Sequence, residues 1–343
     1  MSHTPASNPT ILVTGSAGFI GSHVAQRLLD EGHRVLGLDN LNDYYDVDLK
    51  KARLERLQNH PNYEHVCADL ADREAIDSMF RQYRPQRVIH LAAQAGVRYA
   101  ATNPHAYTSS NVTGFLHILE GARHYPIEHL VYASTSSVYG ANTQMPFAEH
   151  QSTEHPLTLY AATKKANEMM AHSYAHLYGV PCTGLRFFTV YGPWGRPDMA
   201  LFLFTRAILA SEPIQVFNHG HHQRSFTYID DIVDGVVAIS KSPASKDPDW
   251  SSLAPNPATS DAPYRLFNIG NQQPVELLRY IEVLEDCLGK KAHMEMRPLQ
   301  PGDVPDTQAD VSALIQATGK APQVSVEEGV ARFVDWYRGY YQV

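Results

Sequence analysis

A glycine-rich turn directly after an apolar run is the feature that most constrains how this chain can fold. Residues 11–14 form the apolar run, glycines follow at positions 15, 18 and 21, and residues 19–31 carry apolar side chains at helical spacing. A strand that passes into a helix in this way leaves the N–H groups of the first helical turn open to an anion. We expect Gly15 to form the tight turn, Gly18 to let a pyrophosphate approach, and Gly21 to let the helix pack on the sheet. A tight turn without a ligand is the alternative that three glycines by themselves leave open.

Acidic residues end the next two apolar runs. Asp39 closes the second run, where a carboxylate can accept hydrogen bonds from the ribose hydroxyls of adenosine. The same carboxylate would repel a 2′-phosphate, and the following residue is Asn40 instead of arginine, so the sequence predicts NAD and not NADP as the cofactor. Asp69 follows the run at residues 63–68, and we expect it beside the adenine, as the N-cap of a helix over residues 73–83, or in both roles.

Apolar runs of strand length alternate with helix-length segments through the first half of the chain. This order predicts an α/β fold with a Rossmann-type, doubly wound parallel sheet and helices on both faces. The alternation weakens after residue 188. We therefore expect an NAD-binding domain over residues 1–188 and a smaller C-terminal α/β substrate-binding domain over residues 189–343, with some segments returning to the first domain. The expected strands cover residues 11–14, 34–38, 63–68, 87–92, 129–134 and 181–188, the later helices cover 276–288 and 326–340, and residues 242–263 form a long loop, mobile or partly ordered by function.

Composition and charge exclude several classes of protein. The chain of 343 residues has a formal charge of −8 and no run of lysine or arginine, which argues against nucleic acid or an anionic membrane as a partner. Its three cysteines have no paired spacing and residues 1–10 do not resemble a secretory signal, so we expect a cytoplasmic protein. His219, His221 and His222 have no carboxylate or cysteine at metal-binding spacing, and we expect a solvated turn there without a metal.

A tyrosine and a lysine four residues apart are the candidates for the chemistry. Tyr160 and Lys164 lie at the start of a long predicted helix, and residues at this spacing share one helix face. An ammonium near the phenol would favour the phenolate and lower the pKa of the tyrosine from about 10, so that it could exchange a proton with a substrate hydroxyl. Thr135 lies in a hydroxyl cluster at the end of the fifth run, where it can bind a substrate oxygen or cap the strand end.

The stretches TGSAGFIG and STSSVYG, together with Tyr160 and Lys164, resemble the extended short-chain dehydrogenase/reductase family of nucleotide-sugar epimerases and dehydratases. The similarity covers nearly the whole chain. It implies an enzyme in which a tightly bound NAD oxidises a sugar at carbon 4 and later reduces it again. It also implies that Thr135 is the catalytic hydroxyl, Tyr160 the base and Lys164 the ribose-binding lysine. Further positions that the resemblance assigns to the cofactor are Phe19, Ile20, Asn40, Leu70, Leu91, Ala93, Asn111 and Phe188.

Two serines after Thr135 favour one reaction within this family. Relatives that catalyse dehydration carry acids at the next two positions and decarboxylases carry a glutamate at the second, whereas this chain has Ser136 and Ser137. Without those carboxylates, epimerisation at carbon 4 remains. Residues 95–99 and 186–199 and the 242–263 loop are similar to the branch that interconverts UDP-glucuronate and UDP-galacturonate through a rotating 4-keto intermediate.

A sugar carboxylate requires charge-assisted partners in the site. The resemblance assigns this role to Arg196 together with the hydroxyls of Ser136, Ser137 and Thr189. Arg98 is a further candidate, with a structural ion pair as its alternative.

The same resemblance assigns contacts to the nucleotide part of a UDP-sugar. Arg224 matches the arginine on the diphosphate, Asp303 matches the acid on the uridine ribose, and Met199 belongs to the substrate side. UDP-galactose epimerases often place a second phosphate arginine where this chain has Gln300, and Arg297 is the alternative.

Other functions stay open on the sequence alone. They are a UDP-glucose or UDP-N-acetylglucosamine 4-epimerase, a UDP-glucuronate decarboxylase, and a non-catalytic regulator that binds NAD. Members of the family usually dimerise through two helices, which match residues 105–125 and 157–178, so we expect a homodimer.

Overall fold

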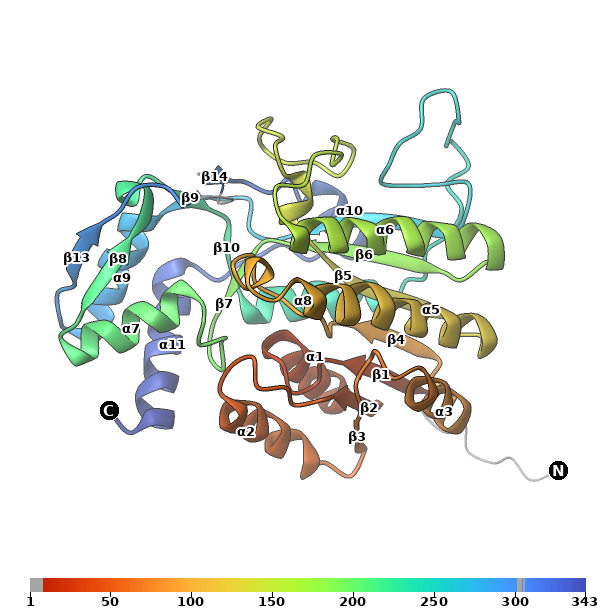
Figure 1. The fold of residues 1–343 in the computed structure, drawn as a ribbon, viewed down its shortest axis with the longest axis horizontal. Helices are drawn as coiled ribbons and strands as arrows, with labels where there is room; N and C mark the ends of the chain where they lie inside the picture. Colours follow the sequence, from red (N-terminus) through yellow and green to blue (C-terminus); the bar gives the residue numbers. More distant parts are fainter. Residues whose placement is uncertain (1–8, 301–303, 305) are drawn as a thin grey trace.

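A seven-stranded parallel sheet forms the centre of the molecule (Figure 1). The structure is a computed structural model that describes residues 9–300, 304 and 306–343. The strand order is β11-β6-β5-β4-β1-β2-β3, and every neighbouring pair is parallel. The strands are β1 (Thr10–Thr14), β2 (Arg34–Asp39), β3 (Tyr63–Cys67), β4 (Arg87–His90), β5 (His129–Thr135), β6 (Cys182–Phe187) and β11 (Tyr264–Ile269).

Helices cover both faces of this sheet, which confirms the predicted doubly wound α/β fold (Figure 1). Side chains of the central strands are buried on both sides; Ile11, Leu12 and Val13 have no exposed surface. Such continuous apolar runs are typical of parallel strands. One layer holds α1 (Phe19–Asp30), α2 (Val47–Gln58) and α8 (Ile229–Ser240), and the other holds α3 (Arg73–Tyr83), α5 (Gly114–His124) and α6 (Leu159–Tyr178).

The strand order reverses between β1 and β4. The chain proceeds from β1 to β2 and β3 on one side, and from β4 to β5, β6 and β11 on the other. In open parallel sheets, ligands bind in the crevice at the carboxyl ends of the strands next to such a reversal. The fold therefore places a crevice beside the glycine turn that follows β1.

A smaller lobe lies at the edge of the molecule opposite α3 (Figure 1). Its strands pair as β7 with β10, β8 with β13, and β9 with β12 and β14. After residue 188 the chain returns to the large sheet twice, in α8 and in β11. No single position therefore separates the two lobes, and the domain boundary at residue 188 stays a prediction. The elements of the second half are β7 (Thr189–Tyr191), α7 (Ala200–Ala210), β8 (Pro213–Val216), β9 (Gln223–Arg224), β10 (Phe226–Tyr228), β12 (Val275–Glu276), α9 (Leu277–Leu288), β13 (His293–Met296), β14 (Asp306–Thr307), α10 (Ser312–Thr318) and α11 (Val326–Tyr341).

One segment differs in detail from the prediction, and one agrees with it. The helix expected over residues 105–125 is divided into α4 (Pro104–Tyr107), a π-helical segment (Thr108–Thr113) and α5. The 242–263 loop has no helix or regular strand, but it is tied internally, since the Asp247 N–H donates to the Ser260 carbonyl at 2.8 Å.

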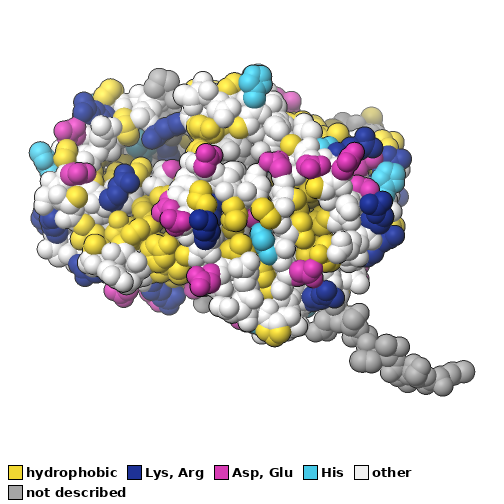
Figure 2. Space-filling view, turned by 60° about the horizontal axis from the view of Figure 1, so that its bottom comes forward, with side chains coloured by type: hydrophobic (Ala, Val, Ile, Leu, Met, Phe, Trp, Pro, Cys, Tyr) yellow, Lys and Arg dark blue, Asp and Glu magenta, His cyan; other side chains and the backbone are white. Residues whose placement is uncertain are grey.

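Charged side chains of both signs are intermixed on the face shown in Figure 2, and no large basic patch gathers there. Within the described residues, no helix has the length and apolar character needed to cross a membrane.

Candidate active site

The glycine turn after β1 has the geometry of an anion cradle. Gly15 has a φ of +72°, and its N–H donates to the Leu38 carbonyl at 2.7 Å. A Cβ added to Gly18 would lie 2.9 Å from the Gly15 carbonyl oxygen, and one added to Gly21 would lie 2.0 Å from it. Gly18 caps α1 without any side chain over the helix N-terminus. The residues present therefore fit a pyrophosphate, because only glycines leave both the turn and the helix end open.

Acidic and amide side chains surround the adenosine end of the crevice. Asp39 accepts hydrogen bonds from the backbone N–H groups of Ala17 (3.1 Å) and Leu41 (2.9 Å), which fix its carboxylate beside the glycine turn. Asn40 donates to Asp69 at 2.8 Å. The alternative role of Asp69 as the N-cap of α3 is wrong, because Asp72 caps that helix by accepting from the Ala75 N–H at 3.0 Å.

A cavity of about 490 Å³ runs from the glycine turn to the end of β5 and into the smaller lobe. It brings most of the predicted site residues together. The predicted residues that line it are Gly15, Gly18, Phe19, Ile20, Gly21, Asp39, Asn40, Asp69, Leu70, Leu91, Ala93, Thr135, Ser136, Ser137, Tyr160, Lys164, Phe188, Thr189, Arg196 and Met199.

Three described residues of the prediction do not line this cavity: Asn111, Arg98 and Arg224. Asn111 is buried behind the cavity, where its amide bonds both the N–H (2.8 Å) and the carbonyl (3.0 Å) of Gln94; its neighbour Ser110 lines the cavity instead. Arg98 is exposed above the ring of Phe217 at 5.4 Å and has no acidic partner among the described residues. Asp303 lies outside the described residues.

Arg224 lines a second, smaller cavity of about 150 Å³. This cavity shares Ser136, Ser137 and Thr189 with the first, so the two spaces adjoin. Arg297, the alternative to a second diphosphate arginine, pairs with Glu295 at 2.6 Å and lines neither cavity.

Tyr160 and Lys164 share one face of α6, which begins where the Thr158 hydroxyl accepts from the Ala161 N–H at 3.2 Å. Burial raises the pKa of Tyr160, while the Thr135 hydroxyl and the charge of Arg196 act to lower it. Burial also lowers the pKa of Lys164 to about 8, against an opposing effect of Glu168. The expectation that Lys164 lowers the pKa of the tyrosine is therefore wrong for the protein without ligands. The lysine is itself in a desolvated position that disfavours its charge.

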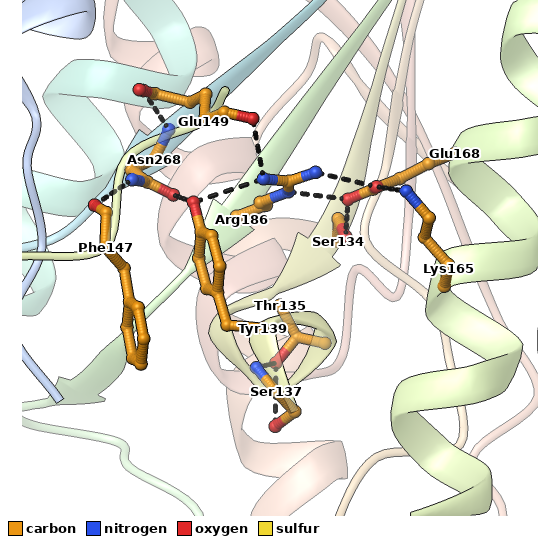
Figure 3. A network of polar contacts seen from close by, with 10 residues as sticks. All are labelled: Ser134, Thr135, Ser137, Tyr139, Phe147, Glu149, Lys165, Glu168, Arg186 and Asn268. Atoms are coloured by element: carbon orange, nitrogen blue, oxygen red, sulfur yellow. Dashed lines mark hydrogen bonds and ion pairs between the residues drawn. The ribbon is translucent and has the colours of Figure 1, made fainter. Parts of the chain in front are cut away.

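A buried ion pair anchors this helix to the sheet (Figure 3). Glu168, one turn beyond Lys164, accepts two hydrogen bonds from Arg186 of β6, at 2.9 and 3.0 Å, and neither side chain is exposed. Ser134 donates to the same glutamate at 2.7 Å. The residue before Thr135 is thus tied directly to the helix that carries Tyr160, which fixes the two candidate catalytic groups relative to each other.

The same network reaches β11, the edge strand of the large sheet, through aromatic and amide groups (Figure 3). Arg186 also donates to the Tyr139 hydroxyl (3.1 Å) and to the Glu149 carbonyl (3.2 Å). Tyr139 in turn donates to Asn268 of β11 at 2.7 Å. The Asn268 amide donates to the Phe147 carbonyl at 2.8 Å, so β11 is connected to the catalytic strand end.

Arg196 is not free in the cavity. Its Nε and Nη2 donate to the two oxygens of Asp198 at 3.0 and 2.5 Å, and Tyr44 donates to the same carboxylate at 3.2 Å. Because Arg196 and Tyr44 stabilise the carboxylate, the pKa of Asp198 is lowered despite burial, which acts to raise it.

Sequence reasoning missed four functional candidates, namely Tyr44, Arg53, Glu168 and Asp198. Glu168 follows Tyr160 and Lys164 at helical spacing, and an acid on that face was a usable signal. Asp198 stands two positions after Arg196, but local spacing does not show which way an acid points. Arg53 has no signal in the sequence, since its partners include backbone carbonyls of Ala17, Trp194 and Gly195. No group of three metal-binding side chains is found among the described residues.

Comparisons with known proteins agree with this geometry. The model of the NAD dependent epimerase/dehydratase family matches residues 11–254. A probable UDP-glucuronate 4-epimerase from Rhizobium meliloti is 52% identical over 96% of this chain and 97% of its own length. The structure of a UDP-glucuronic acid 4-epimerase from Bacillus cereus, with UDP-glucuronic acid and NAD, superposes with a TM-score of 0.86 at 30% identity, covering 97% of this chain and 100% of that one. A UDP-glucose 4-epimerase from Thermotoga maritima gives 0.82 at 29% identity, with 97% and 99% covered.

Proposed function

This chain belongs to the NAD dependent epimerase/dehydratase family, and we propose that it interconverts UDP-glucuronate and UDP-galacturonate by reversible oxidation at carbon 4. The observation that carries the substrate assignment is the position of Arg196. It lines the same cavity as Tyr160 and the hydroxyl residues Ser136, Ser137 and Thr189. The relatives named as UDP-glucuronate 4-epimerases support the same substrate.

The glycine cradle and the Asp39 carboxylate would hold NAD, which would supply reversible hydride transfer at carbon 4 and would not be consumed. Tyr160 takes the proton of the 4-hydroxyl while Thr135 binds the same oxygen. Lys164 lies buried on the same helix face as Tyr160, where it would bind the cofactor ribose. After the 4-keto sugar has turned over within the cavity, Tyr160 gives the proton back on the other face.

The 4-keto intermediate of a glucuronate is a β-keto acid. It loses carbon dioxide when the bond to the carboxylate lies perpendicular to the carbonyl plane, because the breaking bond must then overlap the carbonyl π system. We assign to Arg196 and the neighbouring hydroxyls the task of keeping the bond to the carboxylate within the carbonyl plane, where this overlap is absent. Ser136 and Ser137 also leave the site without the acids that elimination or decarboxylation uses in relatives.

The test of the substrate is the Arg196→Leu variant. Loss of one charge-assisted contact, typically ~1.5–3 kcal/mol, should reduce kcat/KM on UDP-glucuronate by roughly 10- to 150-fold. On UDP-glucose the kcat/KM should fall much less. With UDP-glucuronate, mass spectrometry should detect some UDP-4-keto-pentose. Arg279→Leu is the control, because Arg279 is a surface arginine that also pairs with acids, Glu282 at 3.2 Å and Glu327 at 3.1 Å. Equal losses on both sugars without a pentose product would mean that Arg196 is structural.

The rival function, a 4-epimerase of neutral UDP-hexoses, is not favoured by the comparisons, but one observation makes it worth testing. Asp198 already neutralises Arg196, so the end of the cavity carries less positive charge than a carboxylate site would be expected to have. Turnover of UDP-glucose in preference to UDP-glucuronate by the unmodified enzyme would establish this alternative.

We further propose a homodimer through α5 and α6, which lie side by side on one face (Figure 1). Large apolar side chains are exposed on these helices, including Leu116 (38%), Met169 (53%) and Leu177 (63%). Surfaces of this kind are typical of protein interfaces. A Met169→Lys, Leu177→Glu double variant should sediment as a monomer if this face forms the dimer, and wild-type protein that sediments as a monomer would contradict the proposal.

A further inference from the structure

The turn that carries Arg196 is held by the cofactor side of the molecule. Arg53 of α2 has no exposed surface and donates to the carbonyls of Trp194 (3.0 and 2.7 Å) and Gly195 (2.9 Å). Its Nη1 donates to the Ala17 carbonyl at 3.2 Å and to the Tyr45 hydroxyl at 2.7 Å. One buried arginine therefore fixes the backbone next to Arg196 against the glycine turn.

The side chain of Arg196 is fixed as well. The Asp198 carboxylate occupies the edge of the guanidinium formed by Nε and Nη2. Bidentate pairs of this kind define the plane of the guanidinium. Nη1, on the opposite edge, makes no hydrogen bond with the described residues, and Arg196 lines the cavity.

Tyr44 holds Asp198 from the loop that follows Asp39. The ring centroids of Tyr44 and Tyr99 lie 4.8 Å apart. The Tyr44 hydroxyl lies so close to Gly96 that a Cβ at that position would be only 2.5 Å away. Burial, reinforced by the charge of Asp198, raises the pKa of Tyr44 to about 12, so the hydroxyl stays a donor at neutral pH. The orientation of Asp198 is thus set by the same loop that begins at the adenosine end of the site.

We infer that Asp198, oriented by Tyr44, is a positioning residue that determines specificity by presenting the Nη1 edge of Arg196 to the sugar carboxylate. This inference rests on the proposed function. Arg196 gives the sugar carboxylate its contact through Nη1, and Asp198 sets the direction of that contact. Removing Asp198 should therefore leave the binding of UDP-glucuronate nearly unchanged but let the carboxylate leave the plane of the 4-keto group.

The test compares Asp198→Asn, Tyr44→Phe and Asp43→Asn. Asp43 is an exposed acid in the same loop that does not line the cavity, so its variant changes the charge without touching Arg196. Thermal unfolding first establishes that each variant is folded. Kinetics on UDP-glucuronate and UDP-glucose, with UDP-4-keto-pentose measured by mass spectrometry, then give the readout.

We expect Asp198→Asn to lower kcat on UDP-glucuronate by about tenfold, to change KM by less than ~3-fold, and to raise the pentose share of the product by at least ~5-fold. Tyr44→Phe should act in the same direction to a smaller extent, and it carries the test if Asp198→Asn does not fold. Asp43→Asn should behave as wild type.

Three results overturn the inference or its premise. A product ratio and kinetic constants equal to wild type in both variants would reduce Asp198 to a surface ion pair. A lower KM with an intact kcat would mean that Asp198 competes with the substrate for Arg196 instead of positioning it. Wild-type enzyme that turns over UDP-glucose but not UDP-glucuronate would show that the proposed function is wrong, and the inference with it.

Discussion

Breaking the buried Glu168–Arg186 pair should destabilise the protein strongly. Glu168→Gln keeps the shape of the side chain but leaves the Arg186 guanidinium, which is 0% exposed, without the one carboxylate that it binds among the described residues. Removing one partner of a buried pair typically costs ~3–5 kcal/mol. At the ~2 °C per kcal/mol expected for a chain of this size, the midpoint of thermal unfolding should fall by roughly 6–10 °C.

The double variant Glu168→Gln, Arg186→Met is the matched control. It removes both charges and should recover a large part of the lost stability, because no uncompensated charge stays buried. Thermal and denaturant unfolding of the wild type, both single variants and the double variant form a double-mutant cycle. A cost below ~1 kcal/mol for Glu168→Gln would refute the reasoning, since that is the range of exposed pairs.

The same pair predicts how stability depends on acid. Burial acts to raise the pKa of Glu168, but the charge of Arg186 and its hydrogen bonds lower it below the usual 4.5. A carboxyl group with a lowered pKa in the folded state stabilises the protein above its unfolded pKa, and this stabilisation is lost as the pH falls through the folded pKa. The double variant should lose this part of the acid dependence.

The remaining predictions concern the cofactor and the chemistry. Tyr160→Phe should stay folded and bind NAD but lose at least ~10²-fold in turnover, measured with UDP-glucuronate, and near-normal activity would remove Tyr160 from the mechanism. Because the Asp39 carboxylate repels a 2′-phosphate, calorimetric titration should give tighter binding of NAD than of NADP, and the opposite order would contradict the assignment. Burial lowers the pKa of Lys164 from the usual 10.5 to about 8, so folding is penalised while the lysine is protonated, and the penalty disappears as the pH rises from about 8 to above 10. Without ligands, Lys164→Met should therefore be more stable than wild type by ~3 kcal/mol at pH 7 in denaturant unfolding, and the difference should shrink as the pH rises and vanish only above the usual pKa of 10.5; a constant difference would contradict the buried charge.

The large sheet and the cofactor side of the site could be predicted from the sequence. Local signals determine them: apolar runs in alternation, glycines at one turn, and Asp39 at a strand end. The interruption before α5 could not be predicted, because a π-helical segment depends on the tertiary contacts of Asn111, which bonds Gln94 and Thr163. The N-cap of α3 was predicted at Asp69, but Asp72, three residues later, caps the helix.

The substrate side was harder to predict because its contacts join distant segments. Arg196 was identified as a candidate, but its pairing with Asp198 and Tyr44 depends on how the loop after β2 meets the turn after β7. The pKa of Tyr160 was expected to fall, yet desolvation, which no spacing reveals, outweighs the nearby charges. Arg98 and Arg224 were both predicted to contact the substrate. Only the folded structure distinguishes them, because Arg224 lines the smaller cavity whereas Arg98 lines neither of the two cavities.

The return of β11 to the edge of the sheet has a consequence for synthesis on the ribosome. β6 has β5 on one side, but its other edge is paired only by β11, and Asn268 of that strand completes the network around Tyr139. While the chain is emerging, the first six strands of the sheet are made long before this partner, and β6 presents an unpaired edge of a kind that pairs with other chains. Completion of the seven-stranded sheet therefore waits until residue 269 has left the exit tunnel, and a ribosome that stalls between β6 and β11 leaves a nascent chain whose β6 edge is open.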